Sequence, residues 1–211
     1  MIPIYEYGQV PNSEIFARDN IASNVEGAVT EILAQVAARG DEALREYTLR
    51  FDKADLTNLE VTEAEIDEAF AAVEPEFVAI LEQAAANIRA FHEKQRRNSF
   101  VVADQPGVVL GQKIVPIQKV GLYVPGGTAA YPSTVLMDSI PAKIAGCPQL
   151  VMVTPPGANG KVNPVILAAA KIAGVDRIFK VGGAQAVAGL AFGTETLPKV
   201  DKIVGPGNAY V

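Results

Sequence analysis

The sequence predicts an α/β protein in which a Rossmann-like parallel sheet with flanking helices follows a largely helical region. The prediction rests on three observations. Four short apolar runs after residue 118 each end in a turn rich in glycine and proline. Longer segments with helical periodicity separate these runs, and such alternation is typical of βαβ units with right-handed crossovers. The first hundred residues, in contrast, carry mostly helical patterns.

The first helix is expected to begin at Val25, because Ser23 or Asn24 can cap it. Gly40 is expected to end this helix, and Asp41 to cap the next one. The apolar residues of the first helix recur at the spacing of one helix face, and they are Val29, Ile32, Leu33 and Val36.

Two more helices are predicted before residue 100. Thr62 and Glu65 have the spacing of a capping box. Pro75 suits the first turn of a longer helix that we expect to run to about Arg97. The buried side of that helix is predicted to consist of Val78, Leu81, Ala85, Ile88 and Phe91.

The pattern changes between Val101 and Val120. The stretch from Val108 to Gln118 predicts one or two strands, and Pro116 favours an edge strand or a bend. We therefore divide the chain into residues 1–118, the largely helical part of a first domain, and residues 119–211, a Rossmann-like domain that we expect to be incomplete at its C-terminal end.

The four apolar runs predict parallel strands near 120–124, 150–154, 177–181 and 201–204. Helices are predicted between them over 133–147 and 163–173. Pro141 lies inside the first of these helices and should kink or interrupt it.

Three polar side chains stand at or just after the ends of these strands. They are Tyr123, Gln185 and Asn208. Because parallel strands end at one edge of the sheet, where open α/β folds bind ligands, we expect the three to face one crevice. Its floor should be formed by Gly126, Gly127, Gly182, Gly183, Pro206 and Gly207. The alternative is that the glycines only end strands and the polar groups only cap helices.

The predicted crevice lacks the usual nucleotide signatures. The sequence has neither a G-x-G-x-x-G fingerprint nor a Walker A loop. No acidic residue stands where it would take the adenine ribose in the usual way. We therefore expect a weak, open cofactor site.

Net charge, apolar stretches and the number of cysteines indicate which partners and compartments suit the chain. The 211 residues carry a net charge of −6, which disfavours binding to the phosphate backbone of nucleic acid. No apolar stretch is long enough to span a bilayer. Cys147 is the only cysteine, so an intrachain disulfide is impossible, and a cytoplasmic protein is expected.

The sequence offers no catalytic set of its own. His92 is the only histidine and is expected to be a solvated helix residue, while Cys147 is expected to be a buried structural thiol. One histidine and one cysteine cannot supply a tetrahedral zinc site without carboxylates. The last residues follow a strand–turn signal where a helix should begin, so the chain is expected to be truncated.

Several motifs together resemble histidinol dehydrogenases. They are VGLYVPGGT (120–128), STVLM (133–137), PAKIAGC (141–147), VGGAQA (181–186) and VDKIVGPGNAYV (200–211), with RGDEALREYT (39–48) and FD (51–52) nearer the N-terminus. The resemblance covers most of the chain. Since family members are much longer, it implies roughly the N-terminal half of such an enzyme.

The resemblance implies that L-histidinol is oxidised to L-histidine through an aldehyde, with two NAD molecules and one zinc ion per site. By resemblance, Tyr123, Gln185 and Asn208 correspond to the residues that contact NAD. The zinc ligands, the substrate contacts and a Glu-His acid/base pair are expected beyond Val211. The resemblance also implies an aldehyde-dehydrogenase-like architecture and an intertwined homodimer.

Two other functions stay open at this stage. The chain could be a stand-alone module that holds a nucleotide or metabolite without catalysis. It could also be an aldehyde dehydrogenase relative that uses Cys147 as its nucleophile, which requires this thiol to be exposed at the strand-end crevice.

Overall fold

The structure is a computed structural model that describes residues 4–16, 25–126 and 130–207. Its helices are α1 (Asn12–Ile15), α2 (Glu26–Arg39), α3 (Asp41–Asp52), α4 (Glu63–Ala72), α5 (Pro75–His92), the 3₁₀ turn η1 (Glu93–Gln95), α6 (Pro132–Ile144), α7 (Pro164–Ala173) and α8 (Gly183–Phe192). Its strands are β1 (Phe100–Gln105), β2 (Val108–Gln112), β3 (Lys119–Tyr123), β4 (Gln149–Thr154), β5 (Arg177–Lys180) and β6 (Lys202–Val204). None of the helices in these ranges is long and apolar enough to cross a membrane.

The centre of the fold is a four-stranded parallel sheet with the order β5-β4-β3-β6. Each strand lies within two residues of its predicted position, so the predicted α/β class and the parallel pairing are confirmed. Every residue of β4 after Gln149 is buried. Uninterrupted apolar runs of this kind form strands that are covered on both faces, because helices pack above and below a parallel sheet.

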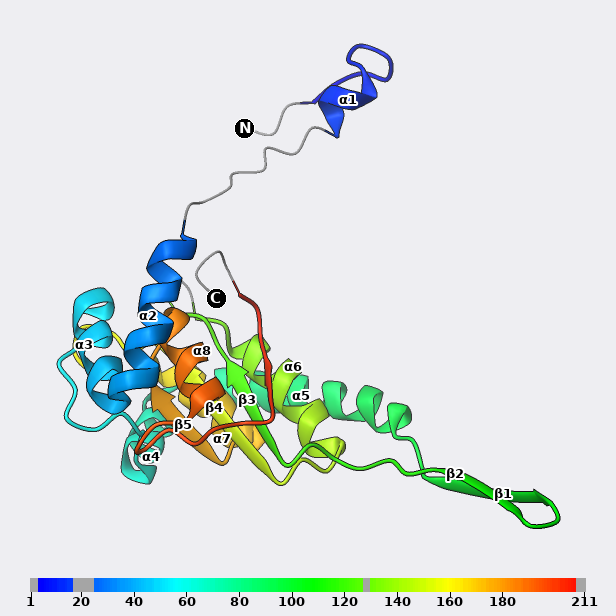
Figure 1. Cartoon of the computed structure of the whole chain (residues 1–211). Helices are drawn as coiled ribbons and strands as arrows, with labels where there is room; N and C mark the ends of the chain where they lie inside the picture. The colour runs from blue at the N-terminus through cyan, green and yellow to red at the C-terminus, as the bar shows by residue number, and fades with distance from the viewer. Residues whose placement is uncertain (1–3, 17–24, 127–129, 208–211) are drawn as a thin grey trace.

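Helices cover both faces of the sheet (Figure 1). Side chains of β4 alternate between the two cores, since successive residues of a strand point to opposite faces. Leu150 and Met152 pack with α4, α5, α6 and α7, whereas Val151 and Val153 pack with α2, α3 and α8. The helices of the first hundred residues therefore complete both layers around the sheet. The division at residue 118 remains a proposal about domain organisation.

The segment before α4 closes the β5 edge of the sheet. Glu60 forms an antiparallel bridge with Phe179, and the Lys180 N–H donates to the Leu59 carbonyl at 2.7 Å. Arg177 holds the same segment through two 2.7 Å hydrogen bonds to the Glu60 carboxylate. This edge therefore presents few free backbone groups for pairing with another strand.

The capping box that starts α4 and the position of Pro75 in the first turn of α5 are confirmed. The long helix is shorter than predicted, because α5 ends at His92 and continues only as a 3₁₀ turn to Gln95. The prediction that Phe91 is buried is wrong, since it is 62% exposed, while Leu81 and Ala85 are buried as expected. Phe91 falls in the last turn of α5, beyond the part that packs on α6.

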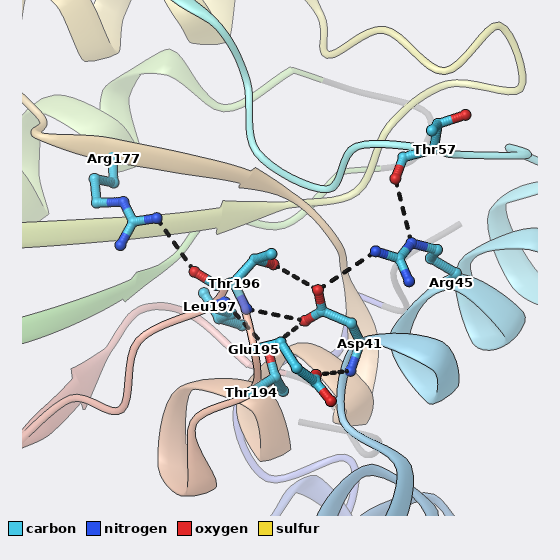
Figure 2. Close-up of polar contacts among 8 residues, drawn as sticks. All are labelled: Asp41, Arg45, Thr57, Arg177, Thr194, Glu195, Thr196 and Leu197. Carbon is cyan, nitrogen blue, oxygen red and sulfur yellow. Dashed lines mark hydrogen bonds and ion pairs between the residues drawn. The ribbon is translucent and has the colours of Figure 1, made fainter.

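The expectation that Asp41 caps α3 is wrong. Gly40 holds the N-cap position with φ of 53°, and Asp41 is the first helical residue. The buried Asp41 carboxylate accepts hydrogen bonds from the hydroxyls of Thr194 at 2.5 Å and Thr196 at 2.9 Å (Figure 2). The Asp41 N–H donates to Glu195 at 2.8 Å, so a carboxylate 154 residues away caps the helix. This cluster ties the α2–α3 corner to the loop that leads into β6.

Two further differences concern β1–β2 and α6. The prediction placed a strand after Val108 but missed its partner β1, which pairs with it in an antiparallel hairpin that projects from the body (Figure 1). All residues of both strands are exposed, so burial gave no pattern to detect. Pro141 does not interrupt α6, which runs through it to Ile144. The proline has no N–H to donate to the Met137 carbonyl, so α6 loses one hydrogen bond at this position but continues to Ile144.

Candidate functional site

The carboxyl ends of β3, β4 and β5 open into two adjoining cavities. The first has a volume of about 490 Å³ and lies among α2, α3 and the start of α8. The second has a volume of about 560 Å³ and lies among α4, the loop after β4 and α7. Four residues line both cavities, namely Asp52, Pro125, Gly126 and Pro155. The position matches the edge at which open α/β sheets bind their ligands.

Tyr123 is the last residue of β3 and lines the first cavity. Its phenol oxygen accepts a hydrogen bond from the Gly183 N–H at 3.1 Å, which leaves the phenol proton to donate to a ligand. Burial is the main cause that raises the pKa of Tyr123, and the nearby charge of Asp52 adds to it. The phenol therefore stays protonated at neutral pH and acts as a donor.

Gln185 lies in the first turn of α8 and lines the same cavity, although only 2% of the residue is exposed. Its side-chain oxygen lies beside Gly183, 2.9 Å from where a Cβ would stand at that glycine. Gly183 has φ of 64°, a conformation that glycine adopts without a steric cost. Gly183 thus contacts both Tyr123 and Gln185, and the structure brings these two predicted residues together.

Pro155 and two glycines form a tightly packed part of the wall. A Cβ at Gly182 would lie 2.7 Å from the Pro155 Cβ, and a Cβ at Gly126 would overlap the same proline ring. Only glycine therefore fits at these two positions while Pro155 keeps its place. Both glycines line the first cavity, as the predicted floor requires.

The third predicted residue, Asn208, lies outside the described residues, and so does Gly127. The chain that leads to Asn208 leaves the sheet next to Tyr123. β6 pairs with β3 as far as Leu122 and Val204, and a Cβ at Gly205 would overlap the Tyr123 carbonyl. Neither cavity includes Pro206 or Gly207 in its lining.

Sequence reasoning missed one acidic residue of the site. Asp52 ends α3 and contributes a carboxylate to the wall shared by the two cavities. We expected no acidic residue to be placed to take the adenine ribose in the usual way. The Asp52 carboxylate comes from a helix of the N-terminal region and not from a turn that follows a strand. One local signal could have pointed to Asp52. It is an aspartate at the C-terminus of a helix, where the helix dipole disfavours negative charge.

Comparison with known proteins gives a consistent result over most of the chain. A family model described as "Histidinol dehydrogenase" matches residues 17–211. The chain belongs to the histidinol dehydrogenase family.

Individual relatives agree with this assignment. The histidinol dehydrogenase of Lactiplantibacillus plantarum is 55% identical over 89% of this chain and 44% of its own length. That of Syntrophotalea carbinolica is 52% identical over 98% of this chain and 48% of its own length. The crystal structure of histidinol dehydrogenase from Elizabethkingia anophelis matches with a TM-score of 0.86 and 42% identity, over 90% of this chain and 44% of that chain. The chain thus spans about half the length of these histidinol dehydrogenases.

The alternative in which Cys147 acts as a nucleophile does not fit the geometry. This cysteine is 7% exposed and belongs to the core that contains α6 and α7. It stands two residues before β4 begins, at the amino edge of the sheet, whereas both cavities lie at the carboxyl edge. His92 lines neither cavity and hydrogen-bonds to Gln95 at 2.7 Å. Neither residue lies at the cavities of this histidinol dehydrogenase family member. The interpretation of Cys147 as a structural thiol and of His92 as a helix residue without a catalytic role is therefore kept.

Zinc, which the resemblance to histidinol dehydrogenases implies, finds no ligand set in the described part of the chain. No group of three or more histidine, cysteine, aspartate or glutamate residues in residues 4–16, 25–126 and 130–207 is arranged to hold a metal ion. The described residues therefore do not form a zinc site.

Proposed function

We propose that this chain forms the NAD-binding part of an enzyme that oxidises L-histidinol to L-histidine through the aldehyde, in the last steps of histidine biosynthesis. One observation carries the proposal. Tyr123 and Gln185, which correspond to NAD-contacting residues by resemblance, line one cavity and both contact Gly183. Membership of the histidinol dehydrogenase family supports the choice of substrate.

Bound NAD would supply the hydride acceptor for the oxidation. The residues of this chain would bind and orient it. The first turn of α8 lines the cavity, and its N–H groups lack acceptors within the helix, so the positive end of the helix dipole favours a phosphate there. The Tyr123 phenol can donate a hydrogen bond, and the Gln185 amide can both donate and accept. Tyr47 and Phe51, whose rings stack with centroids 5.7 Å apart, form an aromatic part of the wall of this cavity.

Zinc and the acid/base pair are proposed to belong to residues beyond Val211. On this basis, we expect that the 211 residues alone do not oxidise histidinol and hold no stoichiometric zinc. Turnover above background with the purified chain and NAD, or one tightly held zinc ion per chain measured by metal analysis, would contradict this expectation.

The decisive experiment uses the full-length protein. NADH formation is measured with histidinol and NAD, and the Michaelis constants of the two are determined separately. Gln185→Ala and Asn208→Ala should raise the constant for NAD by about threefold to tenfold, since each removes neutral hydrogen bonds. A rise confined to histidinol would assign these residues to the substrate. Unchanged constants for both would leave them as turn and cap residues.

A nucleotide- or metabolite-binding module without catalysis would use the same cavity. The same measurement separates the two proposals. If the full-length protein binds NAD in a calorimetric titration but forms no NADH with histidinol, the binding module is the better description.

We also propose a cytoplasmic homodimer. The hairpin β1–β2 supports dimerisation, because it exposes apolar side chains that a monomer would leave in water. Val101 and Val109 are each 71% exposed, and Leu110 is 62% exposed. Replacing Val101, Val109 and Leu110 with threonine or glutamine in the full-length protein should lower the mass measured by light scattering from dimer to monomer. The free, buried thiol of Cys147 supports a reducing compartment.

A further inference from the structure

Asp52 stands where the two cavities meet. It is the last residue of α3, and it lines both cavities together with the turns that follow β3 and β4. Tyr123 also lines the first of these cavities, so the carboxylate and the phenol belong to the same part of the site. A ligand that extends from one cavity into the other would lie beside the residues that line both, Asp52 among them.

The position is unfavourable for a carboxylate on structural grounds alone. The C-terminus of a helix carries partial negative charge, so an acid in the last turn loses stability. The Oδ2 atom of Asp52 is buried and has no hydrogen-bond partner among the described residues. Buried polar atoms are almost always paired, and an unpaired one suggests a role outside folding.

The residue that follows Asp52 has an unfavourable backbone conformation. Lys53 follows it with φ of 61°, and among the described residues it is the only one other than glycine with a positive φ. The Lys53 ammonium does not pair with the Asp52 carboxylate but donates to the Arg50 carbonyl at 2.8 Å. The turn therefore directs the lysine toward the helix end and leaves the carboxylate facing the cavities.

The chemistry of the unpaired carboxylate oxygen of Asp52 indicates which ligand group could bind to it. A carboxylate oxygen in a cavity wall needs a donor, and the adjacent hydroxyls of a ribose offer two donors at the spacing that one carboxylate accepts. We propose that Asp52 positions the dinucleotide by accepting hydrogen bonds from the hydroxyls of one of its two riboses at the junction of the cavities. This inference rests on the proposed NAD site and adds to it a residue that selects an unmodified ribose.

The state of the carboxylate agrees with this role. Burial raises the pKa of Asp52 to about 6. The group is therefore mostly ionised at about pH 7.5 and accepts hydrogen bonds through both oxygens. Tyr123 supplies a donor and Asp52 an acceptor in one site, which suits a ligand that carries both phosphate oxygens and ribose hydroxyls.

The test compares Asp52→Asn and Asp52→Ala with wild type in the full-length protein. The matched control is Asp55→Asn, which removes an exposed carboxylate from the same loop outside both cavities. The ligands are NAD and two analogues that lack the 2′-hydroxyl on either the adenosine or the nicotinamide ribose. Affinity is measured by titration calorimetry, and the Michaelis constant for histidinol is measured separately.

Loss of a charge-assisted hydrogen bond should weaken NAD binding by about 10-fold to 100-fold in Asp52→Ala, with little change for histidinol. Wild type should bind one of the two deoxy analogues more weakly than NAD, and this difference should vanish in Asp52→Ala. A difference that persists in the variant would show that another group reads the ribose, and would overturn the inference while leaving the NAD site intact. If wild type binds no NAD, both the proposed function and this inference fail.

Stability without ligand provides a readout that a purely structural residue would not give. Because the Asp52 charge is unpaired and lies at the wrong end of a helix, Asp52→Asn should raise the melting temperature of the ligand-free protein while weakening NAD binding. A fall in both would assign Asp52 a structural role and overturn the inference. Should the alanine variant not fold, the isosteric asparagine variant still decides the question.

Discussion

The phenol oxygen of Tyr123 and the backbone N–H of Gly183 are joined by a 3.1 Å hydrogen bond across 60 residues of sequence. The bond links the end of β3 to the first residue of α8, and both groups line the first cavity. It therefore sets the distance between two turns that would hold one ligand. A change at either residue should affect both stability and cofactor binding.

Tyr123→Phe keeps the ring but removes the acceptor of the Gly183 N–H. We expect a loss of about 1 kcal/mol in the free energy of unfolding and a rise of about threefold to tenfold in the Michaelis constant for NAD. Urea denaturation and steady-state kinetics of the full-length protein measure the two effects. Tyr131→Phe, which changes an exposed phenol, is the control and should alter neither quantity. Unchanged NAD kinetics in Tyr123→Phe would contradict its proposed contact with the cofactor.

Gly183→Ala should destabilise the protein by about 1–2 kcal/mol, because alanine is strained at φ of 64° and its Cβ would crowd the Gln185 side chain. Gly27→Ala is a useful contrast. Gly27 lies inside α2, and a Cβ there would meet no atom within 4 Å. That change should stabilise the protein by up to about 1 kcal/mol, since alanine favours helix over glycine. Equal effects of the two variants in thermal unfolding would argue against the strain at Gly183.

Asp41→Asn should cost about 2–4 kcal/mol of stability, because the buried carboxylate accepts hydrogen bonds from Thr194 and Thr196 and pairs with Arg45 at 3.4 Å. Glu42→Gln is the control on the same helix. Glu42 makes an exposed ion pair with Arg39, and its loss should change stability far less than the loss of the Asp41 carboxylate.

A double-mutant cycle tests whether the Asp41 cluster acts as a unit. Asp41→Asn combined with Thr196→Val should destabilise the protein less than the sum of the single changes, since each removes the same hydrogen bond. Additive effects in denaturant unfolding would mean that the two side chains contribute independently.

Asp138→Asn should change how stability depends on pH. Burial raises the pKa of Asp138 from 3.8 to about 6, and its Oδ2 has no partner among the described residues. The folded state thus binds the proton more tightly than the unfolded state. The stabilising contribution of the protonated acid is complete below pH 3.8 and is lost as pH rises through about 6. The variant should therefore be more stable than wild type at about pH 8 and should lose this advantage toward about pH 4.

Urea denaturation at several pH values measures this dependence. Asp104→Asn, which changes an exposed carboxylate in β1, is the control and should follow the wild-type curve. An Asp138→Asn advantage that is the same at every pH would show that loss of the charge is not its cause.

The strands of the sheet could be predicted from the sequence, and so could the fact that Tyr123 and Gln185 lie beside one cavity. Buried parallel strands are continuous apolar runs, so β3, β4, β5 and β6 could be located from local pattern. The capping box of α4 is equally local, because its partners lie three residues apart. Tyr123 and Gln185 could be selected because parallel strands end at one edge, a rule that needs only the strand positions.

The surroundings of Asp41 and Asp52 depend on the folded structure and could not be read from local sequence patterns. The partners of Asp41 lie more than 150 residues away, and a carboxylate at the start of a helix looks like a cap until those partners are known. Asp52 became part of the site because α3 packs beside the ends of β3 and β4, which no pattern within α3 encodes. The β1 strand was missed for a related reason, since an exposed hairpin has no buried face to impose alternation on its sequence. Burial and pairing between distant segments are properties of the folded chain, and they determine that Asp41 is enclosed in a hydrogen-bonded cluster while Asp52 lines a cavity.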